Sequence, residues 1–124
     1  MTVARQRLGR AAEDLVAKRL RQLGWRVLER NARTRTGEID LIALEGATLV
    51  FVEVKAQTAG ARLGPERPAF AVGPRKQRQL RLLAREWLAA GRSPSGVAGY
   101  RFDVFGVCFG RDRLADVDHI RHAF

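Results

Sequence analysis

The sequence predicts one α/β domain in which a mixed β-sheet is flanked by α-helices. Helical and strand patterns follow each other in the order α-β-β-β-α-β-β, which places helices against a mixed sheet. The length of 124 residues fits a single domain with its own core, so we take residues 1–124 as one unit. The two central strand patterns carry apolar residues on both sides, which predicts that both faces of the sheet are covered.

The first part of the chain predicts one helix and three strands. Apolar residues such as Leu8, Leu15 and Val16 recur at helical spacing over residues 3–23, and Gly24 fits a helix C-terminus. Strands are predicted over residues 25–29, 38–44 and 49–55, the last two joined by a turn at 45–48.

The second part predicts a long loop, a helix and two strands. Residues 56–73 are rich in Gly, Ala and Pro without a clear period, and we expect them to form a flexible loop. A helix over 74–90 begins with Pro74, a good first-turn residue. Its apolar stripe is Leu80, Leu83, Ala84, Trp87 and Leu88, and its basic face is Arg75, Arg78, Arg81 and Arg85. Strands over 100–109 and, more weakly, 114–120 complete the chain.

Net charge indicates the class of partner. Lys and Arg number 23 against 13 acids, a formal net charge of +10 that favours nucleic acid over anionic lipid, an acidic protein or a merely soluble surface. The single cysteine, Cys108, excludes an internal disulfide and fits a reducing cytoplasm. No apolar run approaches a membrane span and the N-terminus resembles no secretory signal, so we expect a cytoplasmic protein without membrane contact.

The stretch TGEIDLIALEGATLVFVEVK places acids and a lysine inside two apolar strands. Because side chains alternate along a strand, each strand divides into two faces. One face of the first strand carries Glu38, Asp40, Ile42 and Leu44, the other Ile39, Leu41 and Ala43, and one face of the second strand carries Phe51, Glu53 and Lys55. If Leu44 pairs with Leu49, Asp40 lies opposite Glu53 and Glu38 lies opposite Lys55.

Two opposed carboxylates in a half-dry site repel each other unless a cation lies between them. Oxygen ligands without nearby Cys or His suit Mg²⁺ or Mn²⁺ better than zinc. Lys55, on the same face as Glu53, could position a water and offset phosphate charge. The plainer alternative is a Glu38–Lys55 ion pair with Asp40 and Glu53 solvated. The combination with a basic chain favours the site.

Asp40…Glu53-Val54-Lys55 resembles the PD-(D/E)xK nuclease motif without its leading proline. The chain is similar to the YraN family of small bacterial predicted endonucleases, relatives of the archaeal Holliday junction resolvases. Matching stretches are GRAAEDLVAKRL, ERNARTRTGEIDLIA, VFVEVK, PRKQRQL, YRFDVFGV and HIRHAF. The resemblance implies a restriction endonuclease-like core, Asp40 and Glu53 as metal ligands, Lys55 as the catalytic lysine, and a further helical acid. Here that acid is Glu13, whose alternative is a solvated helix residue.

The resemblance also implies DNA, branched or otherwise structured, as the substrate, and a homodimer. Candidate nucleic-acid contacts are Arg33, Arg35, Arg62, Lys76 and Arg78. Family members usually have a basic residue soon after the ExK lysine, but here Ala56-Gln57 follows, so Arg62 could supply that contact from the loop.

Other polar groups favour structural roles. Arg101 and Asp103 are expected to form a structural ion pair, and His119 and His122 to be ordinary histidines and not a zinc fragment. The leading hypothesis is a metal-dependent endonuclease. Its main competitor is a non-catalytic nucleic-acid-binding module on a nuclease fold, and RNA ranks last as a target because no aromatic RNA-binding motif is present.

Overall fold

The computed structural model describes residues 2–58, 72–112 and 114–124. Within them the helices and strands follow the predicted order: α1 (Val3–Gln22), β1 (Arg26–Arg33), β2 (Glu38–Glu45), β3 (Thr48–Thr58), α2 (Pro74–Ala89), β4 (Gly99–Phe109) and β5 (Ala115–Ile120). The strands form one five-stranded sheet in the order β1-β2-β3-β4-β5. β3 and β4 are parallel and the other neighbours antiparallel, so the predicted mixed sheet is confirmed.

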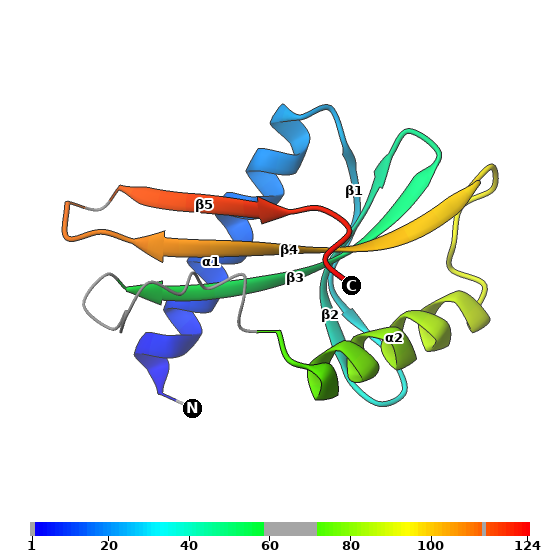
Figure 1. Cartoon of the computed structure of the whole chain (residues 1–124), viewed down its shortest axis with the longest axis horizontal. Coiled ribbons are helices and arrows are strands. Elements are labelled where there is room, and N and C mark those ends of the chain that lie inside the picture. The colour runs from blue at the N-terminus through cyan, green and yellow to red at the C-terminus, as the bar shows by residue number, and fades with distance from the viewer. Residues whose placement is uncertain (1, 59–71, 113) are drawn as a thin grey trace.

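Each helix covers a different face of this sheet, as expected. In Figure 1, α1 crosses behind the strands and α2 lies at the end of the sheet near β2. The α1 side is a core of Ala12, Val16, Ala17, Leu20, Trp25, Leu41, Ala43, Val50, Val52, Phe105 and Val107. The α2 side is a separate core of Ala32, Ile39, Ile42, Leu49, Phe51, Leu80, Leu83, Ala84, Trp87 and Phe102. The apolar stripe predicted for the second helix therefore packs as expected.

Two strands are longer than predicted. β1 reaches Arg33 because it pairs with β2 as far as Arg33↔Glu38, with a register shift between Val27 and Glu29. β3 continues to Thr58 because parallel β4 offers partners up to Phe109. The loop predicted for residues 56–73 was therefore wrong for residues 56–58, which belong to β3. The rest of that segment, 59–71 with Arg62, lies outside the described residues.

Strict alternation fails at Asp40. Leu41 and Ala43 pack on the α1 side as predicted, but Ile39 packs on the α2 side together with Ile42. Opposite this point β1 contains Asn31, whose φ of 49° lies in the left-handed region. This irregular backbone in β1 coincides with the change of face in β2, so the predicted grouping of Ile39 with Leu41 was wrong.

Among the described helices, none combines the length and apolar character needed to cross a bilayer.

Candidate functional site

The site lies where β2 and β3 stop pairing. Leu44 pairs with Leu49 as predicted, and the ladder continues to Leu41↔Val52. One residue further, the carboxylate of Asp40 enters the space between the strands, and its Oδ2 accepts a hydrogen bond of 2.8 Å from the Val54 amide. The backbone amide of Val54 thus holds the side chain of Asp40 in place. In a regular ladder this amide would donate to a main-chain carbonyl of the neighbouring strand.

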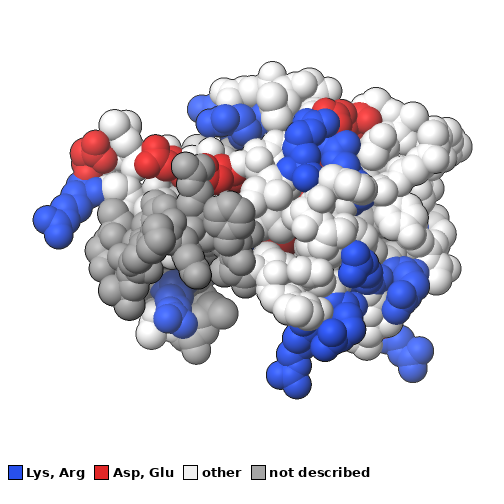
Figure 2. Space-filling model, in the orientation of Figure 1, with Lys and Arg blue, Asp and Glu red and all other residues white. Residues whose placement is uncertain are grey.

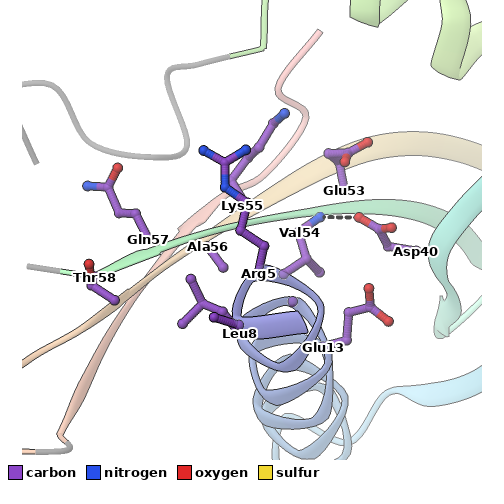
Figure 3. Close-up of a pocket in the computed structure, with 12 residues that line it drawn as sticks. Arg5, Leu8, Glu13, Asp40, Glu53, Val54, Lys55, Ala56, Gln57 and Thr58 are labelled. Atoms are coloured by element: carbon purple, nitrogen blue, oxygen red, sulfur yellow. Dashed lines mark hydrogen bonds between the residues drawn. The ribbon is translucent and has the colours of Figure 1, made fainter. Parts of the chain in front are cut away.

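The carboxyl groups of Asp40 and Glu53 lie near each other, close enough for the charge of Asp40 to raise the pKa of Glu53. Figure 3 shows Glu53 and Lys55 leaving β3 on the side away from α1, while Glu13 rises from α1 toward Asp40. A cavity of about 700 Å³ is lined by these side chains, by Ala4, Arg5, Leu8 and Gly9 of α1, and by Val54, Ala56, Gln57 and Thr58 of β3. The structure thus brings Glu13, Asp40, Glu53 and Lys55 to one cavity.

The acids in this cavity are held in an unfavourable electrostatic environment. Glu53 is 8% exposed, and burial, followed by the charge of Asp40, raises its pKa from 4.5 to about 7. Burial and then Asp40 also raise the pKa of Glu13. Like charges gathered in a half-dry cavity favour binding of a cation or a proton.

Two lysines face these acids. Lys76, in the first turn of α2, places Nζ 3.6 Å from Oε2 of Glu53. The nearby lysines oppose the rise in the Glu53 pKa, Lys76 more than Lys55. Lys76 was predicted as a nucleic-acid contact, and in this structure its ammonium pairs with Glu53 inside the group of acids.

The alternative cross-strand pair between Glu38 and Lys55 is not formed. Glu38 instead accepts a hydrogen bond of 2.9 Å from Nη1 of Arg33, with both side chains largely exposed. Lys55 lines the cavity beside Glu53. From this position its side chain can meet a ligand that enters the cavity.

The donor set fits a hard divalent cation in part. Among the described residues, no group of three or more His, Cys, Asp or Glu side chains is close enough together to hold a metal. Magnesium commonly takes only one or two protein carboxylates and completes its shell with waters and phosphate oxygens. Asp40 and Glu53, which line one cavity, suit that role. All three acids, Glu13 included, stay predictions as metal ligands.

Three arginines predicted as nucleic-acid contacts lie outside the lining of the carboxylate cavity. Arg33, Arg35 and Arg78 are exposed, and Figure 2 shows Lys and Arg side chains gathered over α2. Arg35 belongs to the β1–β2 turn, which is anchored to α2 by Glu86. Oε1 of Glu86 accepts hydrogen bonds from Thr34 Oγ1 at 2.9 Å, Thr36 N at 3.1 Å and Thr36 Oγ1 at 2.8 Å.

Sequence reasoning missed this role of Glu86. The contacts join residues 50 and 52 positions apart. The only local signal is that Glu86 is the single acid in the basic helix α2. A turn anchored in this way presents Arg35 at a fixed place.

The predicted structural pair of Arg101 and Asp103 is confirmed, with Arg101 Nε 2.9 Å from Asp103 Oδ1. His119 Nε2 lies 2.8 Å from Asp103 Oδ2, and the backbone amide of His122 donates to Oδ1 at 3.0 Å. Burial acts to raise the pKa of Asp103, but the hydrogen bonds from His119 and Arg101 hold it below its usual 3.8. The imidazole of His119 stacks on Phe105 at 4.0 Å between ring centroids, a packed structural position.

The chain resembles known sequences over nearly its whole length. The family model described as "Uncharacterised protein family UPF0102" matches residues 12–107. A UPF0102 protein of Rhodococcus jostii (strain RHA1) is 48% identical over 118 residues, which cover 94% of this chain and 95% of the relative. UPF0102 proteins of Anaeromyxobacter dehalogenans (46% over 121 residues, 97% and 85%) and Geobacter metallireducens (41% over 124 residues, 100% and 97%) are similar in the same way.

Proposed function

We propose that this chain, which belongs to the UPF0102 family, is a metal-dependent endonuclease that hydrolyses phosphodiesters in branched or otherwise structured DNA. In this proposal the sheet and its two helices form a restriction endonuclease-like core, and the cavity beside β3 is the active site. The family name itself carries no activity, so the proposal depends on the site.

One observation carries it: two carboxyl groups, Asp40 and Glu53, lie close together in one cavity at the end of a strand pair, with Lys55 beside them. Lys76 lies 3.6 Å from Glu53, and a simple ion pair of this kind would lower the pKa of the acid. Here burial and repulsion raise the Glu53 pKa to about 7, and such perturbed groups cluster at functional sites.

Each residue then has a defined task. A Mg²⁺ or Mn²⁺ ion held by Asp40 and Glu53 supplies Lewis-acid stabilisation of the negative charge that develops on the phosphate. Asp40 keeps its orientation through the Val54 amide, 2.8 Å away. Lys55 orients the attacking water and offsets charge on the phosphate oxygens. Lys76, 3.6 Å from Glu53, balances the acids before substrate enters.

Substrate binding draws on the charge distribution. The net charge of +10 and the exposed Arg33, Arg35 and Arg78 supply phosphate contacts around the cavity. Preference for branched DNA and action as a homodimer are carried over from the resolvase-like relatives that the motifs resemble.

A second function has one observation in its favour. Because the described residues gather no group of three potential metal ligands, the fold could hold nucleic acid without cutting it. Such a module would bind DNA tightly and in a salt-sensitive way, but would take up no divalent metal.

The test separates cleavage from binding. Asp40→Asn and Lys55→Ala are compared with the wild type and with Glu38→Gln, a control that removes an exposed acid from the same hairpin. Cleavage of a four-way junction is measured in Mg²⁺, and binding in EDTA. We expect both site variants to lose cleavage by a factor on the order of 10² or more, to bind within about two-fold of wild type, and the control to cleave normally. Cleavage that survives both substitutions would overturn the proposal.

A further inference from the structure

A small groove lies between α2 and the beginning of β4, away from the carboxylates. It encloses about 100 Å³ and is lined by Arg81, Ala84, Arg85, Leu88, Tyr100 and Phe102. At about 30 Å³ for each water in the liquid, this is room for roughly three waters. A groove of this size admits one flat ring, and is too small for a helix or a duplex.

One wall of the groove is an exposed aromatic ring on a buried aromatic support. Tyr100 is 57% exposed, an unusual position for a large side chain next to a core. Its ring meets Phe102 edge to face at 6.2 Å and Phe51 at 6.1 Å, both of which are buried. Because these contacts restrict the ring, it can stack on a ligand with little loss of conformational entropy.

The opposite wall carries positive charge. Arg81 and Arg85 come from α2 and both are exposed, and the described residues that line the groove include no acid. The guanidinium of Arg81 lies 5.2 Å from the centroid of Phe124, which stacks on Phe102 at 4.9 Å. A stacking ring beside arginines is the arrangement by which proteins hold single-stranded nucleic acid. An apolar peptide would match the rings but would leave both arginines without a counter-charge.

The groove lies on the same side of the sheet as Glu53. Phe102 pairs with Phe51 and Val104 pairs with Glu53 along the parallel β3–β4 ladder. Tyr100 is therefore four residues from the level of Glu53, about 13 Å at 3.3 Å per residue. α2 spans the same interval, from Lys76 at Glu53 to Leu88 at the groove. At the 3.4 Å rise of one DNA strand, about 13 Å is roughly four nucleotides.

We propose that this groove binds one unpaired nucleobase of a DNA strand by stacking it on Tyr100 while Arg81 and Arg85 contact the adjoining phosphates. The inference rests on the proposed function, because it places the bound base relative to the phosphate that is cut. The base lies roughly four nucleotides from the phosphate in the carboxylate cavity. The substrate is then DNA with an unpaired segment next to the cut, as at a flap or an open junction.

The experiment measures binding in EDTA, where cleavage plays no part. Labelled single-stranded and fully duplex DNA of the same sequence are titrated with wild type, Tyr100→Leu and Tyr100→Phe. Leu keeps an apolar side chain but removes the ring, and Phe keeps the ring. We expect Tyr100→Leu to weaken single-strand binding by about 5- to 150-fold, Tyr100→Phe to bind within about two-fold of wild type, and duplex binding to stay unchanged.

A second pair of variants guards against a folding defect at Tyr100. Arg85→Glu reverses a charge inside the groove, and Arg75→Glu reverses one on the same helix outside it. We expect Arg85→Glu to weaken single-strand binding at least several-fold more than Arg75→Glu. Thermal unfolding of all variants checks that each is folded.

Three outcomes would overturn the proposed role of the groove. These are unchanged single-strand binding in Tyr100→Leu, equal losses of affinity for single strand and duplex, or equal effects of the two charge reversals on single-strand binding. Failure here differs from failure of the nuclease proposal. Metal-dependent cleavage without any effect of Tyr100→Leu would remove the groove and keep the nuclease. Ring-dependent binding of single strands without cleavage would keep the groove and remove the nuclease. A parallel RNA oligonucleotide shows which sugar the groove prefers, and tighter RNA binding would overturn the assignment to DNA.

Discussion

Replacing Glu53 by Gln should stabilise the metal-free protein at pH 8. Glu53 is 8% exposed, and burial and the nearby charge of Asp40 raise the pKa of its carboxyl. Gln keeps the size and polarity of the side chain but removes the charge that burial and Asp40 make unfavourable. A substitution that abolishes the proposed activity is thus expected to strengthen the fold, as often occurs at functional sites.

The magnitude follows from the shift in the Glu53 pKa, from 4.5 to about 7. At 1.36 kcal/mol per pKa unit, this is roughly 3 kcal/mol. Because the folded protein holds the proton more tightly than the unfolded chain, folding carries no penalty well below pH 4.5. The penalty grows as the pH rises and is complete above about pH 7. The opposing effect of Lys76 is already contained in this pKa.

The assay is urea unfolding in EDTA at pH 4.5 and pH 8. At pH 8 the free energy of unfolding of Glu53→Gln should exceed that of the wild type by up to about 3 kcal/mol. For a domain of this size this corresponds to a rise on the order of 10 °C in melting temperature. At pH 4.5 the gain should fall below about 1 kcal/mol. Glu38→Gln, in the same hairpin but exposed, should stay within about 0.5 kcal/mol of wild type at both pH values.

Two results would refute this reasoning. If Glu53→Gln is no more stable than wild type at pH 8, the carboxylate is not under strain. If the gain is the same at both pH values, it comes from packing and not from charge.

Three further predictions concern the cation, the buried ion cluster and the basic face. Mn²⁺ at about 100 times its Kd should stabilise the wild type by roughly 2.7 kcal/mol and leave Asp40→Asn unchanged, as measured by melting temperature; equal shifts in both proteins would place the metal elsewhere. Asp103→Ala should cost about 3 kcal/mol in urea unfolding at pH 7, since it leaves Arg101 with Glu45 alone. Because the folded-state pKa of Asp103 lies below 3.8, this difference should persist above that pH and shrink as the pH falls further; a constant difference would contradict the pairing. Arg78→Gln should lower the slope of log K against log salt for DNA binding by about 1, and an unchanged slope would show that Arg78 makes no phosphate contact.

The fold was predictable where local chemistry alone decides it. The turn containing Gly46, which has a φ of 59°, joins two apolar runs, so the pairing of Leu44 with Leu49 could be predicted and was confirmed. The stripe of Leu80, Leu83 and Trp87 predicted the buried face of α2 in the same way, because helical spacing reports which side meets the sheet.

Other features depend on contacts that a single sequence does not contain. The extension of β3 to Thr58 is due to the partner strand β4, more than forty residues later in the chain. Ile39 packs on the face opposite to Leu41, beside the irregular backbone at Asn31, and alternation alone does not predict this change of face.

The site was predictable in its members more than in its arrangement. Motif and spacing identified Asp40, Glu53 and Lys55, which line one cavity. Spacing did not show that the Asp40 carboxylate accepts a hydrogen bond from the Val54 amide, nor that Lys76 forms an ion pair with Glu53. Both depend on where strand pairing stops and on how α2 docks, which are tertiary effects.

The most direct test of the central claim is a cleavage assay with purified protein. Labelled duplex, nicked, flapped, four-way and single-stranded DNA are incubated with Mg²⁺, Mn²⁺ or EDTA. Asp40→Asn protein, purified identically, exposes any contaminating nuclease. The account predicts metal-dependent cutting of a structured substrate that is lost in EDTA and in Asp40→Asn. Absence of cutting on every substrate, or equal cutting by the variant, would contradict it.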